Sequence, residues 1–248
     1  MKKLILLELV TLAVITVFML ISGFISECVM AQENKFIGQE IIISDIVIKE
    51  DYEALKVEII FPGIQGLENK SVEEKINQDI QKDILHFKDE LLTESEEYLK
   101  LAKSERWEIG KYEASAYYTV HYQKNNLLSL SIFYYRYTLG AHGSTWQKAY
   151  NLNLTTGGSI SLSDILKEKK DYVEVINQEI KRQIQLSPED FFDSGTVFQS
   201  INLNQLFYLV EDGVVIYFGL YEIAPYSSGI RYFKIPFSLF ETYYSKTK

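Results

Sequence analysis

Two apolar runs rich in β-branched residues follow the N-terminal part of the sequence. Residues 40–49 (EIIISDIVIK) and 55–61 (LKVEIIF) are rich in Ile and Val, and the second run alternates up to Pro62-Gly63. Short runs of this kind that stop at turn residues predict β-strands. We therefore expect two strands, the second of which ends at Pro62.

A long helical pattern comes next. Its apolar positions recur at spacings of four and three: Val72, Ile76, Ile80, Ile84, Phe87 and Leu91. This spacing places them on one face of a helix. Ser71 with Glu74 three residues later is a capping-box pattern, so the helix is predicted to begin there and to run to about Lys103.

The period then changes to two. Residues 114–122 alternate, so that Tyr117, Thr119 and His121 share one face of a predicted strand. Lys124-Asn125-Asn126 predicts a hairpin turn, because Asn tolerates left-handed backbone angles, and residues 127–138 form the returning strand.

The remaining pattern repeats these elements. Residues 150–154 alternate, and residues 155–158 (TTGG) predict a tight hairpin turn. A second helix region begins at Ser163, and Ile176-Asn177-Gln178-Glu179-Ile180 within it is like Ile76-Asn77-Gln78-Asp79-Ile80 of the first helix, a likeness that any two amphipathic helices can produce. Three strand-like runs close the chain: 205–210, 213–219 and 230–235.

This order predicts an α+β fold with mainly antiparallel sheets and two principal amphipathic helices. The length of 248 residues suits one large domain or two small ones, and we expect two small adjoining domains after an N-terminal export segment.

The export segment is predicted from residues 1–31. Lys2-Lys3 precedes an apolar run over residues 4–25 that only Glu8 interrupts, and Val29-Met30-Ala31 fits a signal-peptidase site after Ala31. An uncleaved membrane anchor is the alternative, because the uninterrupted part nearly reaches the ~20 residues that span a bilayer. A lipoprotein is not favoured, since Glu27 precedes Cys28. Either way, residues 32–248 are expected outside the cytoplasmic membrane, which they meet only through an uncleaved segment.

The amino-acid composition limits the classes of partner and of site that the protein can have. The net charge of −9 argues against nucleic acid or an anionic lipid surface. Cys28 is the single cysteine, which excludes an internal disulfide and a thiolate metal cluster. The aromatic share of 14%, with 18 Tyr, is high, and tyrosine suits half-buried sheet faces and binding surfaces.

The sequence offers no recognisable catalytic apparatus. His86, His121 and His142 are the only histidines, and none has the spacing of a zinc helix. A GxSxG elbow and a glycine-rich phosphate loop are also absent from the sequence. We therefore expect no enzyme activity, no metal and no cofactor, and we interpret His86 and His121 as structural.

Two aromatic, glycine-containing segments are the candidate binding sites. The first, residues 134–146 (YYRYTLGAHGSTW), contributes Tyr137, Gly140, His142, Gly143 and Trp146. The second contributes Tyr221, Glu222, Pro225 and Tyr226. Glycine permits unusual backbone angles or close approach, and tyrosines on turns suit recognition. A purely structural role for both segments remains the alternative.

Several motifs resemble a known pair of domains. FPGIQGL (61–67), VEEKINQDI (72–80) and GAHGSTW (140–146) resemble the PdaC-type domain. NLNLTTGGSISLSDIL (151–166), FYLVEDGVVIYF (207–218), YEIAPYSSG (221–229) and IPFSLF (235–240) resemble the domain of unknown function that regularly follows it. The resemblance places the first domain at residues 40–149 and the second at 150–242, with Gly140–Gly143 as the turn that sets the two halves against each other.

The resemblance implies a class of function. This pair of domains lies N-terminal to peptidoglycan deacetylase domains and in the extracellular part of RsiV-type anti-sigma factors, which bind lysozyme. It implies a cell-envelope protein of a Gram-positive type of bacterium. Only Met1-Lys2-Lys3 precedes the apolar run, and the sequence ends at Lys248, so we expect neither a sigma-binding segment nor a deacetylase domain here.

The expected function is therefore an extracytoplasmic binding module for a cell-wall component or an envelope protein such as lysozyme. A peptidoglycan-directed hydrolase that uses carboxylates near His142, and a purely structural envelope domain, are the alternatives.

Overall fold

A six-stranded sheet carries the N-terminal half of the structure, a computed structural model that describes residues 41–166 and 171–240. The predicted export segment lies outside these residues. The strands follow one another in the order β1 (Ile42–Asp51), β2 (Leu55–Gln65), β3 (Tyr112–Lys124), β4 (Leu127–Tyr137), β5 (Ser144–Asn153) and β6 (Gly158–Ser159). Neighbouring strands are antiparallel except β2 and β3, which are parallel.

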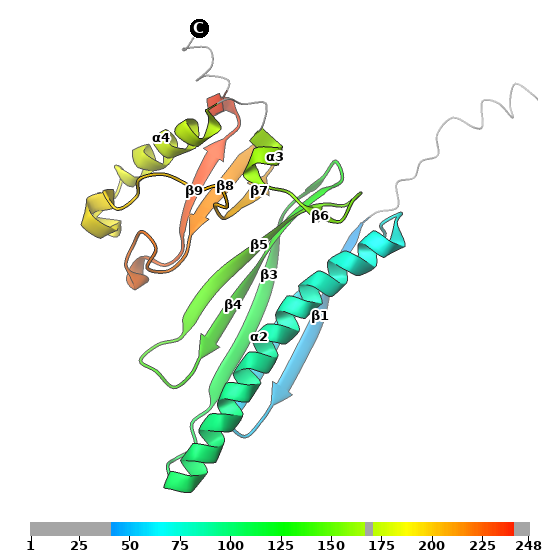
Figure 1. The fold of residues 1–248 in the computed structure, drawn as a ribbon, viewed down its shortest axis with the longest axis vertical. Coiled ribbons are helices and arrows are strands. Elements are labelled where there is room, and N and C mark those ends of the chain that lie inside the picture. Colours follow the sequence, from blue (N-terminus) through cyan, green and yellow to red (C-terminus); the bar gives the residue numbers. More distant parts are fainter. Residues whose placement is uncertain (1–40, 167–170, 241–248) are drawn as a thin grey trace, which may run out of the picture. The chain divides into compact units, whose positions relative to one another are not determined.

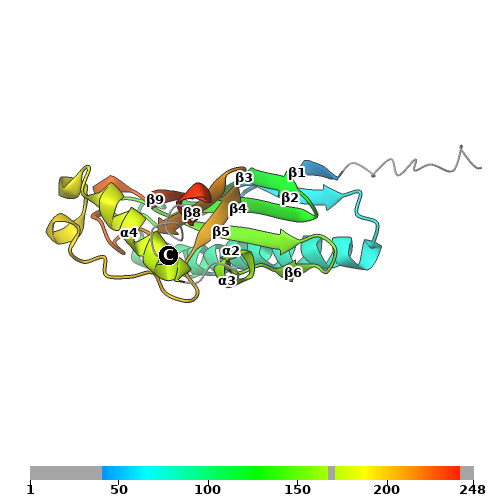
Figure 2. The same ribbon diagram turned by 90° about the horizontal axis from the view of Figure 1, so that it is seen from above.

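The helix α2 (Lys70–Glu105) makes the parallel β2–β3 connection and covers one face of this sheet (Figure 1). Viewed from above, α2 lies in a separate layer beneath the strands (Figure 2). All six predicted apolar positions are buried in the core between helix and sheet. The helical spacing thus predicted both the helix and its buried face correctly.

Both boundaries of the β2–α2 segment differ from the prediction. The helix begins after Asn69, whose side chain accepts hydrogen bonds from the amides of Ser71 and Val72, so Ser71 is not the cap. Strand β2 continues through Pro62 to Gln65. Its parallel pairing with β3 ends at Ile59, so Pro62 is paired with β1 alone, and proline is tolerated in a strand that is paired on one side.

The C-terminal half contains a second, three-stranded antiparallel sheet. It consists of β7 (Phe207–Val210), β8 (Gly213–Phe218) and β9 (Arg231–Pro236). The helices α3 (Leu162–Leu166) and α4 (Tyr172–Ile184) pack with it around a second core. Short 3-10 helices, η1 (Pro188–Asp190), η2 (Phe192–Gly195) and η3 (Tyr226–Ser228), complete this half.

The two similar helical segments, residues 76–80 and 176–180, have the same structural role. Asn77 accepts a hydrogen bond from the amide of Ile64 and donates one to its carbonyl, both at 2.8 Å. Asn177 accepts from the amide of Ile201 at 2.9 Å and donates to Ser200 at 2.8 Å. Each asparagine therefore ties its helix to a backbone segment of its own half, while the flanking isoleucines are buried.

The second sheet docks on the face of the first sheet that is opposite α2. Along β4, Leu128 and Leu130 belong to the helix-side core, whereas Ser129 between them points the other way. Ser129 accepts a hydrogen bond from the amide of Leu209 at 2.9 Å, and the Asn151 side chain donates to the carbonyl of Phe207, also at 2.9 Å. Polar side chains of the first sheet thus satisfy the backbone of the β7 edge.

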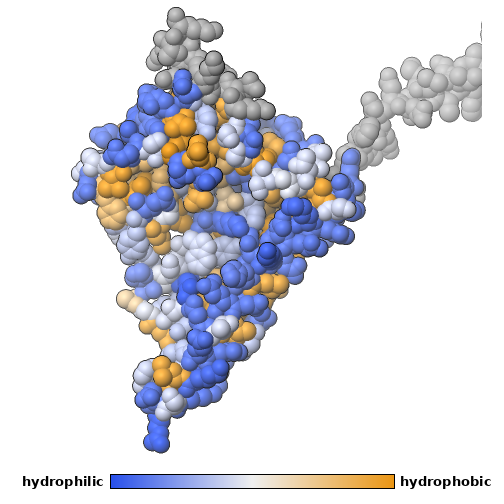
Figure 3. Space-filling model, in the orientation of Figure 1, coloured by the Kyte–Doolittle hydropathy of each residue, from blue (hydrophilic) through white to orange (hydrophobic). Residues whose placement is uncertain are grey.

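The predicted fold class is confirmed: the protein is α+β with mainly antiparallel sheets. Within residues 41–166 and 171–240, none of the helices has the length and apolar character to cross a membrane. In Figure 3, hydrophilic residues follow the line of α2, and hydrophobic residues gather over the C-terminal half.

Candidate functional site

The two predicted segments meet in the structure. His142 stacks on Tyr226 with 4.1 Å between ring centroids, and the Tyr226 hydroxyl donates a 2.8 Å hydrogen bond to the carbonyl of Gly143. However, residues 138–143 connect β4 and β5, which are neighbours in one sheet. The interpretation of Gly140–Gly143 as the turn between the halves was therefore wrong: it is a hairpin loop of the first sheet that contacts the second half from the side.

Of the two roles predicted for the glycines of this loop, the structure shows close approach at Gly143 and no left-handed glycine. Leu139, not a glycine, adopts the left-handed conformation, with φ of 62°. Gly140 faces open space apart from the carbonyl of His142, at 3.8 Å from an added Cβ. At Gly143 a Cβ would collide with the ring of Tyr135, so this glycine is required for close packing.

The second segment forms a rigid loop before β9. Glu222 accepts a hydrogen bond from the amide of Gly219 at 2.8 Å, which closes the turn and gives the carboxylate a structural role. Tyr221 has a φ of 63° and is 58% exposed. Pro225 is extended and precedes η3, which carries Tyr226. The loop thus presents both tyrosine rings, 5.8 Å apart between centroids.

Tyr226 forms one wall of a groove that both halves build, which we call the aromatic groove. Its volume is about 330 Å³. Tyr117, Phe133 and Thr145 line it from strands β3, β4 and β5, on the face opposite α2, and Tyr226, Ser227 and Tyr232 line it from the second half. All the residues that line it are uncharged.

Trp146 lies away from this groove. It stacks on Tyr134 with 5.2 Å between centroids and meets Phe87 of α2 edge-on at 5.3 Å. It therefore packs on the helix side of the sheet. Tyr137 is at the end of β4, four residues from Phe133 and on the same face by alternation. The structure thus groups His142, Gly143 and Tyr226, and it separates Trp146 from them.

A polar network lies beneath the aromatic groove and joins the two sheets. The Tyr232 hydroxyl donates to Gln147 Oε1 at 2.8 Å, and Gln147 Nε2 donates to Ser131 at 2.6 Å. Ser131 in turn lies 2.9 Å from Nε2 of His121, whose ring stacks on Tyr208 at 3.8 Å. His121 sits in a β-bulge between Val120 and Tyr122. His121 thus forms part of the contact between the two sheets.

His121 gives the folded state a pH dependence. Burial disfavours its charged form and lowers its pKa to about 4, from an ordinary value of 6.5. The unfolded chain binds the proton more readily than the folded protein. Between the folded pKa of about 4 and the ordinary value of 6.5, the free energy of unfolding therefore rises with pH, and this stability is lost when the pH falls through the same range. Allowing for solvent screening, we expect a contribution of about 1–2 kcal/mol.

Urea unfolding of His121→Gln at several pH values across the window tests this. The variant should lose that part of the pH dependence, because glutamine keeps a polar group near Ser131 but does not titrate. His86→Gln is the matched control, since His86 is exposed on α2. An unchanged pH dependence in His121→Gln would contradict the assignment.

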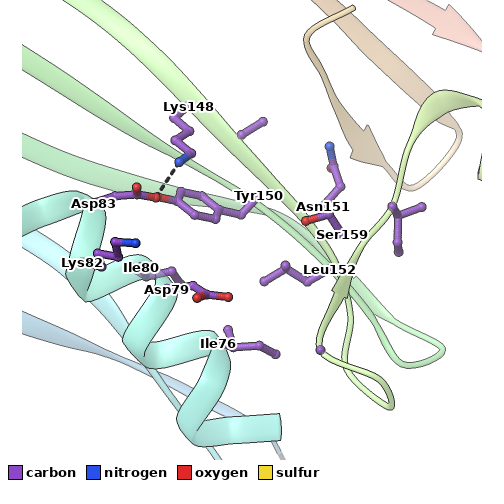
Figure 4. A pocket seen from close by; sticks show the side chains of 13 residues that line it. Ile76, Asp79, Ile80, Lys82, Asp83, Lys148, Tyr150, Asn151, Leu152 and Ser159 are labelled. Atoms are coloured by element: carbon purple, nitrogen blue, oxygen red, sulfur yellow. Dashed lines mark hydrogen bonds and ion pairs between the residues drawn. The ribbon is translucent and has the colours of Figure 1, made fainter. Parts of the chain in front are cut away.

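A second pocket, of about 380 Å³, lies between α2, β5 and the β6 turn (Figure 4). Asp83 accepts hydrogen bonds there from Lys148 at 2.5 Å and from Tyr150 at 2.6 Å. Burial raises the pKa of Asp83, but these two donors outweigh it, and the pKa lies below its usual value. The negative charge of Asp83 is thus balanced by Lys148 within the protein. This ion pair links α2 to β5.

Catalytic geometry around His142 is limited. Its Nδ1 lies 2.8 Å from the carbonyl of Gly143, so this ring nitrogen is engaged within its own loop. In residues 41–166 and 171–240, no group of three or more His, Cys, Asp or Glu side chains is placed to hold a metal ion. The arrangement suits binding by stacking and hydrogen bonding.

Sequence reasoning missed Tyr117, Phe133 and Tyr232 as site residues. The alternation along this strand already placed Tyr117 on the same face as Thr119 and His121, and this was the one feature of the sequence that could have indicated it. It did not show that this face meets the second half. Only the docking of the two sheets brings these rings together.

Comparison with known proteins identifies the two halves. The family model described as Deacetylase PdaC matches residues 48–145, and the model of the protein of unknown function DUF3298 matches residues 163–238. The chain carries a PdaC domain followed by a DUF3298 domain. This is the pair that the motifs predicted. Strands β5 and β6 lie mostly between the two matched ranges, and β5 runs through residues 149 and 150, where the sequence placed the boundary.

Two curated relatives share these domains with the chain. Over 113 residues it is 30% identical to Peptidoglycan-N-acetylmuramic acid deacetylase PdaC of Bacillus subtilis (strain 168), a match that covers 44% of this chain and 24% of the deacetylase. Over 203 residues it is 27% identical to Anti-sigma-V factor RsiV of the same strain, with 78% of this chain and 67% of RsiV covered. The similarity to the deacetylase is thus partial.

A solved structure supports the fold. A DUF3298 family member from Bacteroides fragilis NCTC 9343 superposes with a TM-score of 0.62 and 20% sequence identity, over 82% of this chain and 93% of that protein. At this identity the likeness concerns the fold alone.

Proposed function

We propose that the protein is an extracytoplasmic binding module of the cell envelope, which recognises a cell-wall component or an envelope protein such as lysozyme. The aromatic groove is its binding site, and the module has no catalytic activity of its own. The predicted export segment and the relatives, a peptidoglycan deacetylase and an anti-sigma factor, support the envelope setting.

One observation carries this proposal. Two segments that the sequence selected independently meet through the stacking of His142 on Tyr226. Beside this contact lies the groove, which Thr145 of the first segment and Tyr226 of the second line together. A groove lined by residues of both halves gives the two domains a shared role. Tyrosine-rich, partly exposed surfaces of this kind are enriched in binding sites. The net charge of −9 adds support for a basic protein partner such as lysozyme.

Calorimetric titration of the full-length chain with lysozyme and with purified peptidoglycan fragments tests the proposal. We expect heat of binding with one of them, and about tenfold weaker binding for Tyr226→Ala, which removes one wall of the groove and its hydrogen bond to Gly143. Trp146→Ala is the matched control, because it removes a partly exposed aromatic ring on the other face of the sheet.

The proposal fails if neither titrant produces heat, or if Tyr226→Ala and Trp146→Ala behave alike. Incubation with labelled peptidoglycan tests the lack of catalysis. Release of a labelled product that stops in His142→Ala would favour the hydrolase instead.

A further inference from the structure

We propose that the aromatic groove binds an uncharged sugar ring, whose C–H face packs against the exposed ring surface of Tyr117, the outer member of its stacked pair with Phe133. The inference rests on the proposed function and names the ligand class of the same site.

A stacked pair of aromatic rings lines the groove from the first sheet. Tyr117 and Phe133 stack with 4.8 Å between centroids and 12° between ring planes, and Tyr117 is 55% exposed. The two ring planes are nearly parallel and each ring covers part of one face of the other, so Phe133 holds Tyr117 in place while the rest of the Tyr117 ring stays open to a ligand with an apolar face. A pyranose ring has such a face, formed by its axial C–H groups, and carries hydroxyls around its edge.

The rings of the opposite wall are held by the protein before any ligand binds. The hydroxyl of Tyr226 donates to the carbonyl of Gly143, and that of Tyr232 donates to Gln147 Oε1, both at 2.8 Å. Their hydroxyl protons are thus engaged, while their oxygens can still accept hydrogen bonds from a ligand. Such preorganisation lowers the entropy lost on binding.

The lining excludes a charged ligand. Every residue that lines the groove is uncharged, in a chain of which 24% is charged. A carboxylate or ammonium bound there would lose hydration without gaining a counter-charge. A wholly apolar ligand fits poorly too, since five of the nine lining residues, Tyr117, Thr145, Tyr226, Ser227 and Tyr232, carry hydroxyls. An uncharged molecule with one apolar face and a polar edge satisfies both conditions.

The volume favours a small ligand over a protein surface. At about 330 Å³, the groove is at the lower end of the range of small-molecule pockets, roughly 300–1,000 Å³. Stable protein interfaces instead bury about 800 Å² on each partner. The groove thus fits one ring of a glycan.

The test compares two tetrasaccharides that share N-acetylglucosamine. One is the uncharged tetramer of β-1,4-linked N-acetylglucosamine; the other is a hyaluronan tetrasaccharide, in which charged glucuronate alternates with it. Each is added to the full-length chain, and binding is followed by calorimetry and saturation-transfer NMR. We expect binding of the uncharged tetramer, with the strongest transfer at the ring C–H protons, and at least tenfold weaker binding of hyaluronan.

Variants of Tyr117 complete the test. Tyr117→Ala should weaken binding of the uncharged tetramer about tenfold, whereas Tyr117→Phe should keep it within about twofold, because the ring face remains. Trp146→Ala should leave binding unchanged. Tyr117 is largely exposed, so these variants are expected to fold.

The outcomes separate this inference from the proposed function. If lysozyme binds and the uncharged tetramer does not, the sugar inference is overturned and the binding module stands. If neither lysozyme, peptidoglycan fragments nor the tetramer binds, both fail. Equal binding of hyaluronan, or an unaffected Tyr117→Ala, also overturns the inference.

Discussion

Replacing Tyr217 with alanine is expected to lower the free energy of unfolding by about 3–5 kcal/mol. Tyr217 is 1% exposed and lies on β8 between the two sheets. Its ring is 6.2 Å from those of both Tyr208 and Tyr232, and its hydroxyl accepts a 3.1 Å hydrogen bond from the amide of Ala149. Alanine would leave a cavity where the halves meet and an unpaired amide on β5.

Tyr217→Phe is the matched control. It keeps the ring and removes the hydroxyl, so it should cost only about 1–2 kcal/mol through the unpaired Ala149 amide. Both variants are measured by urea unfolding followed by circular dichroism. If alanine costs no more than phenylalanine, the ring does not support the contact between the halves, contrary to the structure.

Replacing Asn151 with alanine is expected to lower the free energy of unfolding by about 2–3 kcal/mol. The Asn151 side chain is 8% exposed; it donates to the carbonyl of Phe207 and accepts a 2.7 Å hydrogen bond from Ser129, which itself holds the amide of Leu209. Its removal takes the donor from the Phe207 carbonyl and the acceptor from the Ser129 hydroxyl proton. The loss should be greatest at the edge of β7, where the second sheet docks.

Hydrogen exchange locates that effect. In Asn151→Ala, the amides of β7 should exchange faster relative to those of α2, whose contacts are untouched. Asn204→Ala is the control, because Asn204 is exposed, and its change should stay within about 0.5 kcal/mol. Uniform acceleration across both halves would show that Asn151 supports global stability without a special role at β7.

The elements that the sequence predicted well depend on neighbours along the chain. The hairpin at Asn125-Asn126 is confirmed, with φ of 54° and 59°, because two left-handed residues suffice to reverse a strand. The turn at residues 155–158 is confirmed with Gly157 at φ of 69°. The buried face of α2 follows from periodicity alone, since every residue on it meets the same layer.

The errors occur where distant segments compete with a local signal. Ser71 and Glu74 formed a plausible capping box, but Asn69 caps the helix, and Glu73 binds the amide of Leu67. Pro62 was expected to end β2, but the strand continues because β1 pairs with it alone. Nor does any local pattern show that β2 and β3 are parallel; that follows from the return path of α2.

For the candidate site, too, local patterns selected residues, but only the assembled sheet shows which of them lie together. Residue type and turn chemistry were enough to select His142, Gly143 and Tyr226, because aromatics and glycines at turns are unusual by themselves. The same criteria also selected Trp146, which packs on the helix side, and Glu222, which closes a turn. A list of residue types does not show which face of a strand a side chain will occupy in the assembled sheet.

By itself the sequence determined the elements, their buried faces, the α+β class and the pair of domains, because these depend on local periodicity and on motifs carried by short segments. The tertiary structure alone decided that Tyr117, Phe133, Tyr226 and Tyr232 form one groove. These residues lie far apart along the chain, and they meet where the second sheet docks on the first, through contacts such as those of Ser129 and Asn151 with the edge of β7. The site follows from that docking.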